Sequence, residues 1–433
     1  MNRMRRNLFS TTLAGFGALL GGKTTNAQTA AASASTPTQG YTPVRTLNGV
    51  TLPYQLKDGV KEFHLIAEEI EHEFAPGSVA KCWGYNGRTP GPTIEAVEGD
   101  RVRILVTNKL KEHTTIHWHG ILLPSGMDGV GGLNQPQIKP GETFAYEFTL
   151  RQHGTHMYHP HADEMIQLAV GMMGMFIIHP KDGEPKKIDR DYAILLHNWA
   201  LHPGTHRPDP SVMTEFDLWT MNSKVFPAID PLVARTGERV RIRLGNLSMW
   251  NHPIHLHGHQ FVVTGSDGGR WPETIWRPET TEIVGVGQTR DIEFVAIPGD
   301  WAMHCHMSHH TMNAMGHDVP NVLGAKQASV DKKIASLVPG YMSMGSNGMA
   351  EHQDHSMHME GPVNTLPMMM GKGPFGNLEM GGMFTVVKIR DDLAPGDYRD
   401  PGWFPNPEGT VAYRVDGPAT PAARDDHANH QHH

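Results

Sequence analysis

Apolar and polar residues alternate along two stretches of the chain that match each other. Residues 96–108 read AVEGDRVRILVTN and residues 234–246 read ARTGERVRIRLGN, at an offset of 138 residues and without a gap. In each copy a glycine-containing turn precedes an alternation of period two, which predicts a β-strand. An offset this long indicates two copies of a whole domain rather than a solenoid of short repeats. We therefore predict one domain over residues 42–181 and a second over residues 182–400.

The second copy of the repeat is interrupted before its last strand. The segment GMMGMFII at residues 171–178 corresponds to MGGMFTVV at residues 380–387, and both predict a final strand. Residues 324–378 lack strand periodicity and are rich in methionine, histidine and glycine. We interpret them as a long loop inserted before the last strand of the second domain. Residues 401–433 form a predicted C-terminal tail that contains histidines.

Composition favours an all-β fold and argues against nucleic acid or a membrane surface as a binding partner. The 433 residues include 47 glycines and 32 prolines, which suits β-rich domains with many turns. A net charge of -8 without a basic block argues against nucleic acid and against an anionic membrane surface as partners. Two cysteines cannot build a disulfide framework. We predict that Cys82 is a small buried residue, whereas the neighbours of Cys305 mark it as a metal ligand.

The N-terminus predicts an export signal over residues 1–27. Arg5 and Arg6 precede an apolar stretch from Leu13 to Leu20, and small residues at 25–27 suit a cleavage site. The apolar stretch is too short to span a bilayer. The twin arginine resembles a Tat signal, and an ordinary secretory signal is the alternative. In either case we expect the mature protein to be periplasmic or secreted.

Histidines spaced two apart carry the candidate chemistry, since residues at this spacing share one face of a strand. The four pairs are His117 and His119, His159 and His161, His255 and His257, and His304 and His306. The repeat offset places the first pair on the third, so the pairs belong to the repeat. Eight imidazoles that converge in this way favour copper as the bound metal.

Cys305 lies between two of these histidines and must point to the opposite face of its strand. His252 lies three residues before His255 and therefore also points away from the eight histidines. Together with His310 and a weak methionine ligand, these residues match the ligand set of a blue-copper electron-transfer site. The tripeptide at 304–306 can thus serve two metal sites at once.

These motifs resemble those of the multicopper oxidases, the family of laccases and cuprous oxidases. The match runs from Tyr85–Pro92 through Met127–Val130 to the segment around Cys305. The resemblance implies two cupredoxin-like, Greek-key β-sandwich domains and one type 1, one type 2 and two type 3 copper ions. It assigns the type 1 copper to His252, Cys305 and His310, and the type 2 copper to His117 and His255. It assigns the type 3 pair to His119, His159, His161, His257, His304 and His306.

The chain departs from the larger family members in two places. His252 follows His161 by 91 residues, too few for a further whole domain between the two predicted ones. Pro160 stands where Cys305 stands in the repeat, so the first domain has no thiolate for a blue copper. Both features resemble the two-domain, or small, laccases. That resemblance implies a homotrimer with each copper cluster between the first domain of one chain and the second domain of its neighbour, and a monomer with an internal cluster is the alternative.

Two further site residues are less constrained by the sequence. Met315 lies ten residues after Cys305, the usual spacing of the axial ligand, and we predict it in that role. Met380 is the alternative, from the alignment of the last strands. Asp128 matches the acid with which the family supplies protons to the cluster, although an Asp before a Gly is also common in turns. Thr311 stands where some bacterial relatives carry a second acid.

The expected activity is the oxidation of a reducing substrate, one electron at a time, coupled to the four-electron reduction of dioxygen to water. Electrons would pass from the type 1 site through Cys305 to His304 and His306. The methionines of residues 324–378 suit Cu(I) as substrate, since thioether sulfur is a soft ligand. Phenols are the alternative. A copper nitrite reductase and a non-catalytic copper-storage protein are the other classes considered, and Pro160 together with the eight histidines argues against the first.

Overall fold

The structure is a computed structural model that describes residues 40–202, 204–214, 216–313, 336, 363–364, 366 and 371–416. Four expectations lie wholly or partly outside these residues: the export signal over residues 1–27, the ligand Met315, most of the insertion at 324–378, and the tail beyond residue 416. In the described part strands dominate, and α1 (Glu164–Ala169) is a short α-helix. No helix of that part is long and apolar enough to cross a bilayer.

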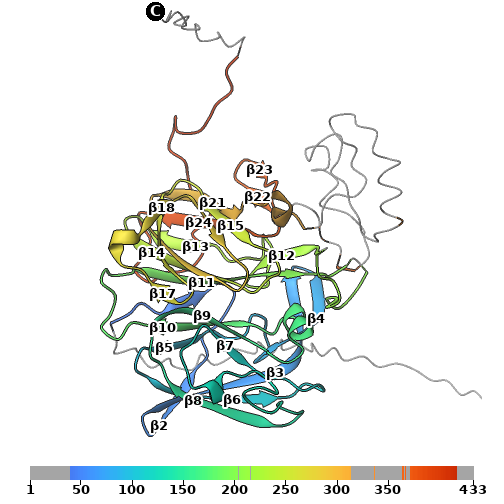
Figure 1. The fold of residues 1–433 in the computed structure, drawn as a ribbon. Coiled ribbons are helices and arrows are strands. Elements are labelled where there is room, and N and C mark those ends of the chain that lie inside the picture. The colour runs from blue at the N-terminus through green and yellow to red at the C-terminus, as the bar shows by residue number, and fades with distance from the viewer. Residues whose placement is uncertain are drawn as a thin grey trace, which may run out of the picture. The chain divides into compact units, whose positions relative to one another are not determined.

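The first half of the described chain forms two sheets (Figure 1). One has the order β2-β3-β6-β8, with β4 paired to β3, and the other has the order β5-β10-β9-β7. We call these strands the first domain. Their bounds are β2 (Tyr54–Lys57), β3 (Val60–Ala75), β4 (Ser78–Tyr85), β5 (Ile94–Val97), β6 (Arg101–Asn108), β7 (His117–His119), β8 (Thr143–Thr149), β9 (Gly154–His159) and β10 (Gly174–His179).

The second half forms two larger sheets, which we call the second domain. One has the order β1-β11-β14-β20-β16-β17, with β12 on β11 and β18 on β16, and the other has the order β13-β24-β21-β15-β19. Their bounds are β1 (Val44–Thr46), β11 (Arg190–Trp199), β12 (Leu218–Met221), β13 (Leu232–Arg235), β14 (Arg239–Asn246), β15 (His252–Leu256), β16 (Phe261–Ser266), β17 (Gly269–Arg270), β18 (Arg277–Glu279), β19 (Thr281–Val284), β20 (Thr289–Val295), β21 (Gly299–Cys305) and β24 (Phe384–Arg390). A short hairpin, β22 (Lys372–Gly373) and β23 (Gly376–Asn377), precedes β24.

The predicted repeat is visible in the pairing of the strands. The repeated alternating segments form β6 and β14, and each pairs antiparallel with a later strand of its own domain, β8 or β20. The final strands β10 and β24 each pair parallel with a short strand, β5 or β13, and antiparallel with β9 or β21. The all-β prediction is confirmed. The domain boundary at residues 181 and 182 stays a prediction, and β1, from the start of the predicted first domain, pairs with β11 of the second.

Three apolar cores hold the strands together. One lies between the two sheets of the first domain and includes Trp118 and Phe176. A second lies between the sheets of the second domain and includes Ile242 and Cys305. The third joins strands of both domains and contains Cys82, which is buried as predicted. Burial raises the pKa of the Cys82 thiol to about 12, so this thiol is unreactive at neutral pH.

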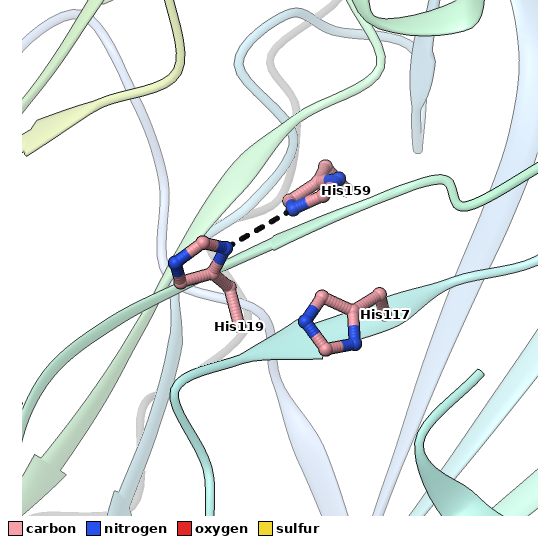
Figure 2. A group of neighbouring side chains, drawn as sticks. All are labelled: His117, His119 and His159. Atoms are coloured by element: carbon pink, nitrogen blue, oxygen red, sulfur yellow. Dashed lines mark hydrogen bonds between the residues drawn. The ribbon is translucent and has the colours of Figure 1, made fainter. Parts of the chain in front are cut away.

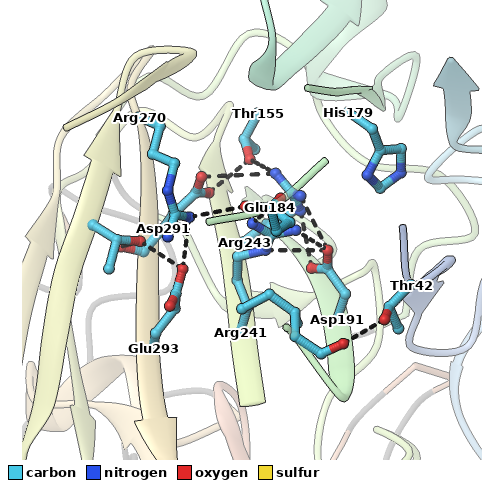
Figure 3. A network of polar contacts seen from close by, with 12 residues as sticks. Thr42, Thr155, His179, Glu184, Asp191, Arg241, Arg243, Arg270, Asp291 and Glu293 are labelled. Atoms are coloured by element: carbon cyan, nitrogen blue, oxygen red, sulfur yellow. Dashed lines mark hydrogen bonds and ion pairs between the residues drawn. The ribbon is translucent and has the colours of Figure 1, made fainter. Parts of the chain in front are cut away.

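A buried network of charges also links the two domains (Figure 3). Asp191 on β11 accepts hydrogen bonds from Arg241 and Arg243 on β14. Arg243 Nη1 donates to Thr155 Oγ1 on β9 over 2.9 Å, and Thr155 Oγ1 donates to Asp291 Oδ1 on β20 over 2.6 Å. Because β9 ends at a histidine of the second predicted pair, this network fixes the strand that carries it.

Candidate metal centres

The predicted blue-copper residues come together in the core of the second domain. Cys305 ends β21, His252 begins β15, and His310 lies in the 3₁₀ turn Ser308–Thr311. Cys305 Sγ lies 3.4 Å from His310 Nδ1 and 3.7 Å from His252 Nδ1, and the two Nδ1 atoms are 3.1 Å apart. All three side chains are buried, and one ligand atom from each lies within 4.8 Å of the others.

Burial prepares these groups for a metal ion. Desolvation lowers the pKa of His252 to about 3 and that of His310 to about 2, so both imidazoles are neutral at pH 7 and can donate a lone pair. Burial raises the pKa of the Cys305 thiol to about 12. A thiolate there therefore requires a cation beside it, as metal binding supplies.

Ser248 orients one of the ligands and was not predicted from the sequence. Its Oγ lies 2.7 Å from His252 Nε2 and 2.7 Å from Asn246 Oδ1. The hydroxyl has two acceptors for its single hydrogen, Asn246 Oδ1 and the Trp250 carbonyl at 2.8 Å, so it can accept the N–H of His252. That bond leaves the Nδ1 lone pair of His252 directed at Cys305. Metal-binding histidines usually donate their other N–H to such a partner, which fixes the orientation of the ring. No spacing motif in the sequence signals this serine.

The histidines of the first domain form a group of four. His117 and His119 lie on β7, which pairs with β9 so that His117 is opposite His159. The ring centroid of His117 lies 5.7 Å from that of His119, 5.4 Å from that of His159 and 5.7 Å from that of His161. His119 Nδ1 and His159 Nε2 face each other at 3.2 Å (Figure 2). Burial lowers the pKa of His159 to about 3, so this ring is also neutral.

The histidines of the second domain form a matching group of four. His255 on β15 is opposite His304 on β21. The ring centroid of His255 lies 4.8 Å from that of His257, 5.7 Å from that of His304 and 5.5 Å from that of His306. The group lies on the face of β21 opposite Cys305, as the alternation of the tripeptide predicts. Within the described residues, no hydrogen bond or ring contact joins this group to the first-domain group.

Two carboxylates lie beside the first-domain group. Asp128 Oδ1 lies 3.4 Å from His117 Nδ1, and the same nitrogen donates to the backbone carbonyl of Asp128 over 2.9 Å. Glu164, which the sequence analysis missed, has Oε1 3.3 Å from His159 Nδ1 and Oε2 3.8 Å from His161 Nε2. Its position three residues after His161, at the start of α1, is the signal that could have identified it.

The structure adds a third methionine to the two candidates for the axial position. Met315 lies outside the described residues. Met380 packs half-buried against the cluster of Phe226, Phe384 and Val386. Met383 instead lies fully buried in the core that contains Cys305.

The backbone also places Met383 between two blue-copper residues. Its N–H donates to the His310 carbonyl over 2.9 Å, and its carbonyl accepts from the Cys305 N–H over 3.1 Å. Phe384 is opposite His304 in the sheet, so the residue before it belongs on the Cys305 face. Met383 is therefore a third candidate for the axial ligand, which the alignment of the last strands on Met380 did not indicate.

Comparisons with known proteins agree with this geometry. Two family models of multicopper oxidases match the chain, one over residues 67–183 and the other over residues 203–322, which together exceed half of the chain. Copper resistance protein A of Escherichia coli is 42% identical over 124 residues, 29% of this chain and 20% of that protein. The chain spans about a fifth to a third of the length of the first curated relatives that it matches.

Solved structures extend the likeness over more of the chain. The blue copper oxidase from Nitrosomonas europaea aligns with a TM-score of 0.57 and 25% identity, over 79% of this chain and 91% of that one. The copper nitrite reductase from Nitrosomonas europaea aligns with a TM-score of 0.51 and 25% identity, over 58% of this chain and 90% of that one.

Fold and sites together define a protein of two cupredoxin-like domains with histidine and cysteine groups suited to copper. The chain belongs to the multicopper oxidase family. Membership implies copper as the cofactor. The buried Cys and His set, with neutral imidazoles and a nearby thioether, fits that metal by the chemistry of its donors.

Proposed function

We propose that the protein oxidises a reducing substrate one electron at a time and reduces dioxygen to water. The observation that carries the proposal is the strand end at Cys305. This residue lies with His252 and His310 in the apolar core, while His304, adjacent in the chain, lies with His255 and His257 on the other face. One peptide unit therefore links a site suited to electron transfer with a site suited to dioxygen chemistry.

The two faces divide the ligands into two sets, and the resemblance to the multicopper oxidases implies which copper each set would hold. His252, Cys305 and His310 would hold the type 1 copper, with Met383 as a weak thioether ligand and Met315 as the alternative. The two groups of four histidines would hold the type 2 and type 3 copper ions, and the resemblance implies His117 and His255 for the type 2 copper. When bound, copper supplies one-electron transfer at the first set and multi-electron reduction of dioxygen at the second.

The protein groups around these ligands orient the histidines, exclude water from Cys305 and deliver protons to the histidine groups. Ser248 keeps the Nδ1 atom of His252 directed into the site. The apolar core excludes water from Cys305, which favours electron transfer with little rearrangement. We assign Asp128 as the acid that delivers protons beside His117, since its carboxylate is within 3.4 Å of that ring and remains partly open to solvent.

The separation of the two histidine groups favours assembly between subunits. Each group has four imidazoles, and no described contact joins the groups within one chain. We propose a homotrimer in which the first-domain group of one chain meets the second-domain group of the next. A monomer that joins its own two groups is the competing arrangement.

We propose Cu(I) as the substrate, with phenols as the alternative, and a periplasmic or secreted location after export through the predicted signal at residues 1–27. The methionine-rich composition of residues 324–378 supports the choice of Cu(I). The name of the E. coli relative, a copper resistance protein, is consistent with it.

A copper nitrite reductase is the competing enzyme, since one such structure aligns with the chain. Pro160 between two histidines of the first domain argues against it, because that position holds no thiolate. The eight histidines argue against it as well, since nitrite reduction needs fewer at its catalytic copper. A storage protein would have no use for a cysteine between two cluster ligands.

Oxygen uptake by the copper-loaded full chain tests the proposal. We expect uptake with Cu(I) as donor, no nitric oxide from nitrite, and loss of uptake in Cys305→Ser. Deletion of residues 324–362 should slow Cu(I) oxidation if these residues gather the substrate, and should leave or increase phenol oxidation. Nitric oxide formation would select the nitrite reductase, and the absence of uptake with either donor would select storage.

A further inference from the structure

His310 is enclosed on the edge that faces away from Cys305. Its Nδ1 atom points to the thiol, and its side chain is completely buried. The other ring nitrogen, Nε2, is also buried and has no hydrogen-bond partner in the described part of the structure. A buried N–H without a hydrogen-bond partner is unfavourable, so its surroundings need an explanation.

Three aromatic rings surround His310. Trp219 on β12 stacks on His310 with centroids 4.9 Å apart and planes at 20°. Trp250 approaches His310 edge-on, at 6.1 Å and 84°. His309 lies next to His310 at 4.2 Å and 69°. We call Trp219, Trp250 and His309 the aromatic cover. The π faces of these rings accept only a weak hydrogen bond from an N–H group, so Nε2 stays in a dry, nearly apolar environment.

The three residues of the aromatic cover differ in how far they are exposed to solvent. Trp219 is buried, whereas His309 and Trp250 are each only partly buried. Of these two, His309 has the shorter contact with His310, 4.2 Å against 6.1 Å between ring centroids. His309 also contacts Trp219 at 5.5 Å and Trp250 at 6.0 Å, so it lies at the junction of the cover.

We infer that the reductant contacts His309, and that the electron reaches His310 across the contact between the two rings. This inference rests on the proposed function and specifies its substrate class. The donor is a small metal ion that an imidazole can bind, and Cu(I) is such an ion. A planar phenol would need direct access to the His310 ring, which is fully buried and has Trp219 stacked on its face.

The electrons balance without a proton. Cu(I) at His309 becomes Cu(II), and the copper held by His252, Cys305 and His310 takes up the one electron. Trp219 is a positioning residue in this scheme, since it acts by keeping His310 dry and out of reach. A phenol would have to lose a proton along with its electron, whereas a metal ion does not.

The test uses the copper-loaded full chain without oxygen and follows the bleaching of the blue absorption band. His309→Phe keeps a ring of similar shape and removes the nitrogens. We expect its rate constant for reduction by Cu(I) to fall at least tenfold, while the band and its potential stay unchanged because the copper ligands are intact. The matched control, His64→Phe, replaces an exposed histidine on β3 and should keep the wild-type rate.

A second readout does not depend on turnover. Ag(I) resembles Cu(I) but gives up no electron, so at His309 it should perturb the blue band of the oxidised protein. We expect this perturbation in the wild type and in His64→Phe, and not in His309→Phe. Trp219→Ala should expose His310, increase the rate of reduction by a phenol and lower the potential, whereas Trp219→Phe should retain the wild-type values.

A wild-type rate with Cu(I) in His309→Phe, or an unchanged response to Ag(I), would overturn the assignment of His309. So would a phenol rate in the wild type that Trp219→Ala does not increase. A wild-type protein that forms no blue band on copper loading would instead contradict the proposed function itself. The two failures are therefore distinguishable.

Discussion

At the scale of the residue, the alternation of side chains along a strand accounts for most of the site. It separates Cys305 from His304 and His306 and places His252 on the side of Cys305, and the structure has them so. Ser248 did not follow from the sequence, because no spacing motif signals its contact with His252. Glu164 was missed although it lies three residues after His161, a spacing that could have identified it. The axial methionine stays a prediction: Met315 and Met380 were chosen by spacing, Met315 lies outside the described residues, and the burial of Met383 beside Cys305 adds a third candidate.

Substitution of Met383 tests the axial assignment. The thioether donates electron density to copper and stabilises Cu(II), so Met383→Leu should keep the blue band and raise the reduction potential. Leucine has a similar volume, so the cost to stability should be below about 1.5 kcal/mol. Met380→Leu is the matched control, because that side chain packs against Phe226 and Phe384. A shift of potential in Met315→Leu with none in Met383→Leu would return the role to Met315.

At the scale of the element, β6 and β14 show how well the sequence repeat predicts which residues of a strand are buried. Both alternate in sequence, and β6 is buried on one face and open on the other, as predicted. All but the first residue of β14 is buried. The difference arises because Arg241 and Arg243 on the polar face of β14 pair with Asp191. Arg241 and Arg243 can be buried because Asp191 on β11 pairs with them. Sequence periodicity carries no information about a partner on another strand.

The buried network predicts how stability depends on pH. Burial alone would raise the pKa of Asp191, but the charges and hydrogen bonds of Arg241 and Arg243 outweigh it and hold this pKa well below its usual value. A carboxyl with a depressed pKa contributes stability above its unfolded pKa of about 3.9, and that stability is lost as pH falls below this value. Chemical denaturation should therefore show a loss of stability from pH 5 to pH 3.

Asp191→Asn isolates this contribution. Removing one partner of a buried ion network should lower the free energy of unfolding by about 3–5 kcal/mol at pH 7. It should also weaken the dependence of this free energy on pH in the acidic range. Lys187→Ala, which breaks an exposed ion pair with Asp189, serves as the control and should change little. Equal stability of Asp191→Asn and wild type at pH 7 would show that the network does not hold the domains together.

At the scale of the whole molecule, the two histidine groups are the central fact. Sequence motifs predicted all eight histidines and their division into pairs. They did not predict how the groups approach each other, because that depends on surfaces and on neighbouring chains rather than on strand periodicity. The resemblance to small laccases implies a trimer, which stays a proposal.

Mixing of two inactive variants tests the arrangement between subunits. His119→Ala damages only the first-domain group, and His304→Ala damages only the second-domain group. If clusters form between chains, refolding the two variants together should produce some clusters with both groups intact and restore part of the oxygen uptake. Each variant alone, refolded in the same way, is the control. No recovery in mixed trimers would favour a cluster within one chain.

The reduction of dioxygen to water is the claim on which the whole account depends. The measurement that tests it most directly is the ratio of donor oxidised to dioxygen consumed by the copper-loaded full chain, with hydrogen peroxide assayed in parallel. The account predicts four electrons per dioxygen, no peroxide, and no catalysed uptake in Cys305→Ser. A ratio of two electrons with accumulating peroxide, or uptake that persists in Cys305→Ser, would contradict it.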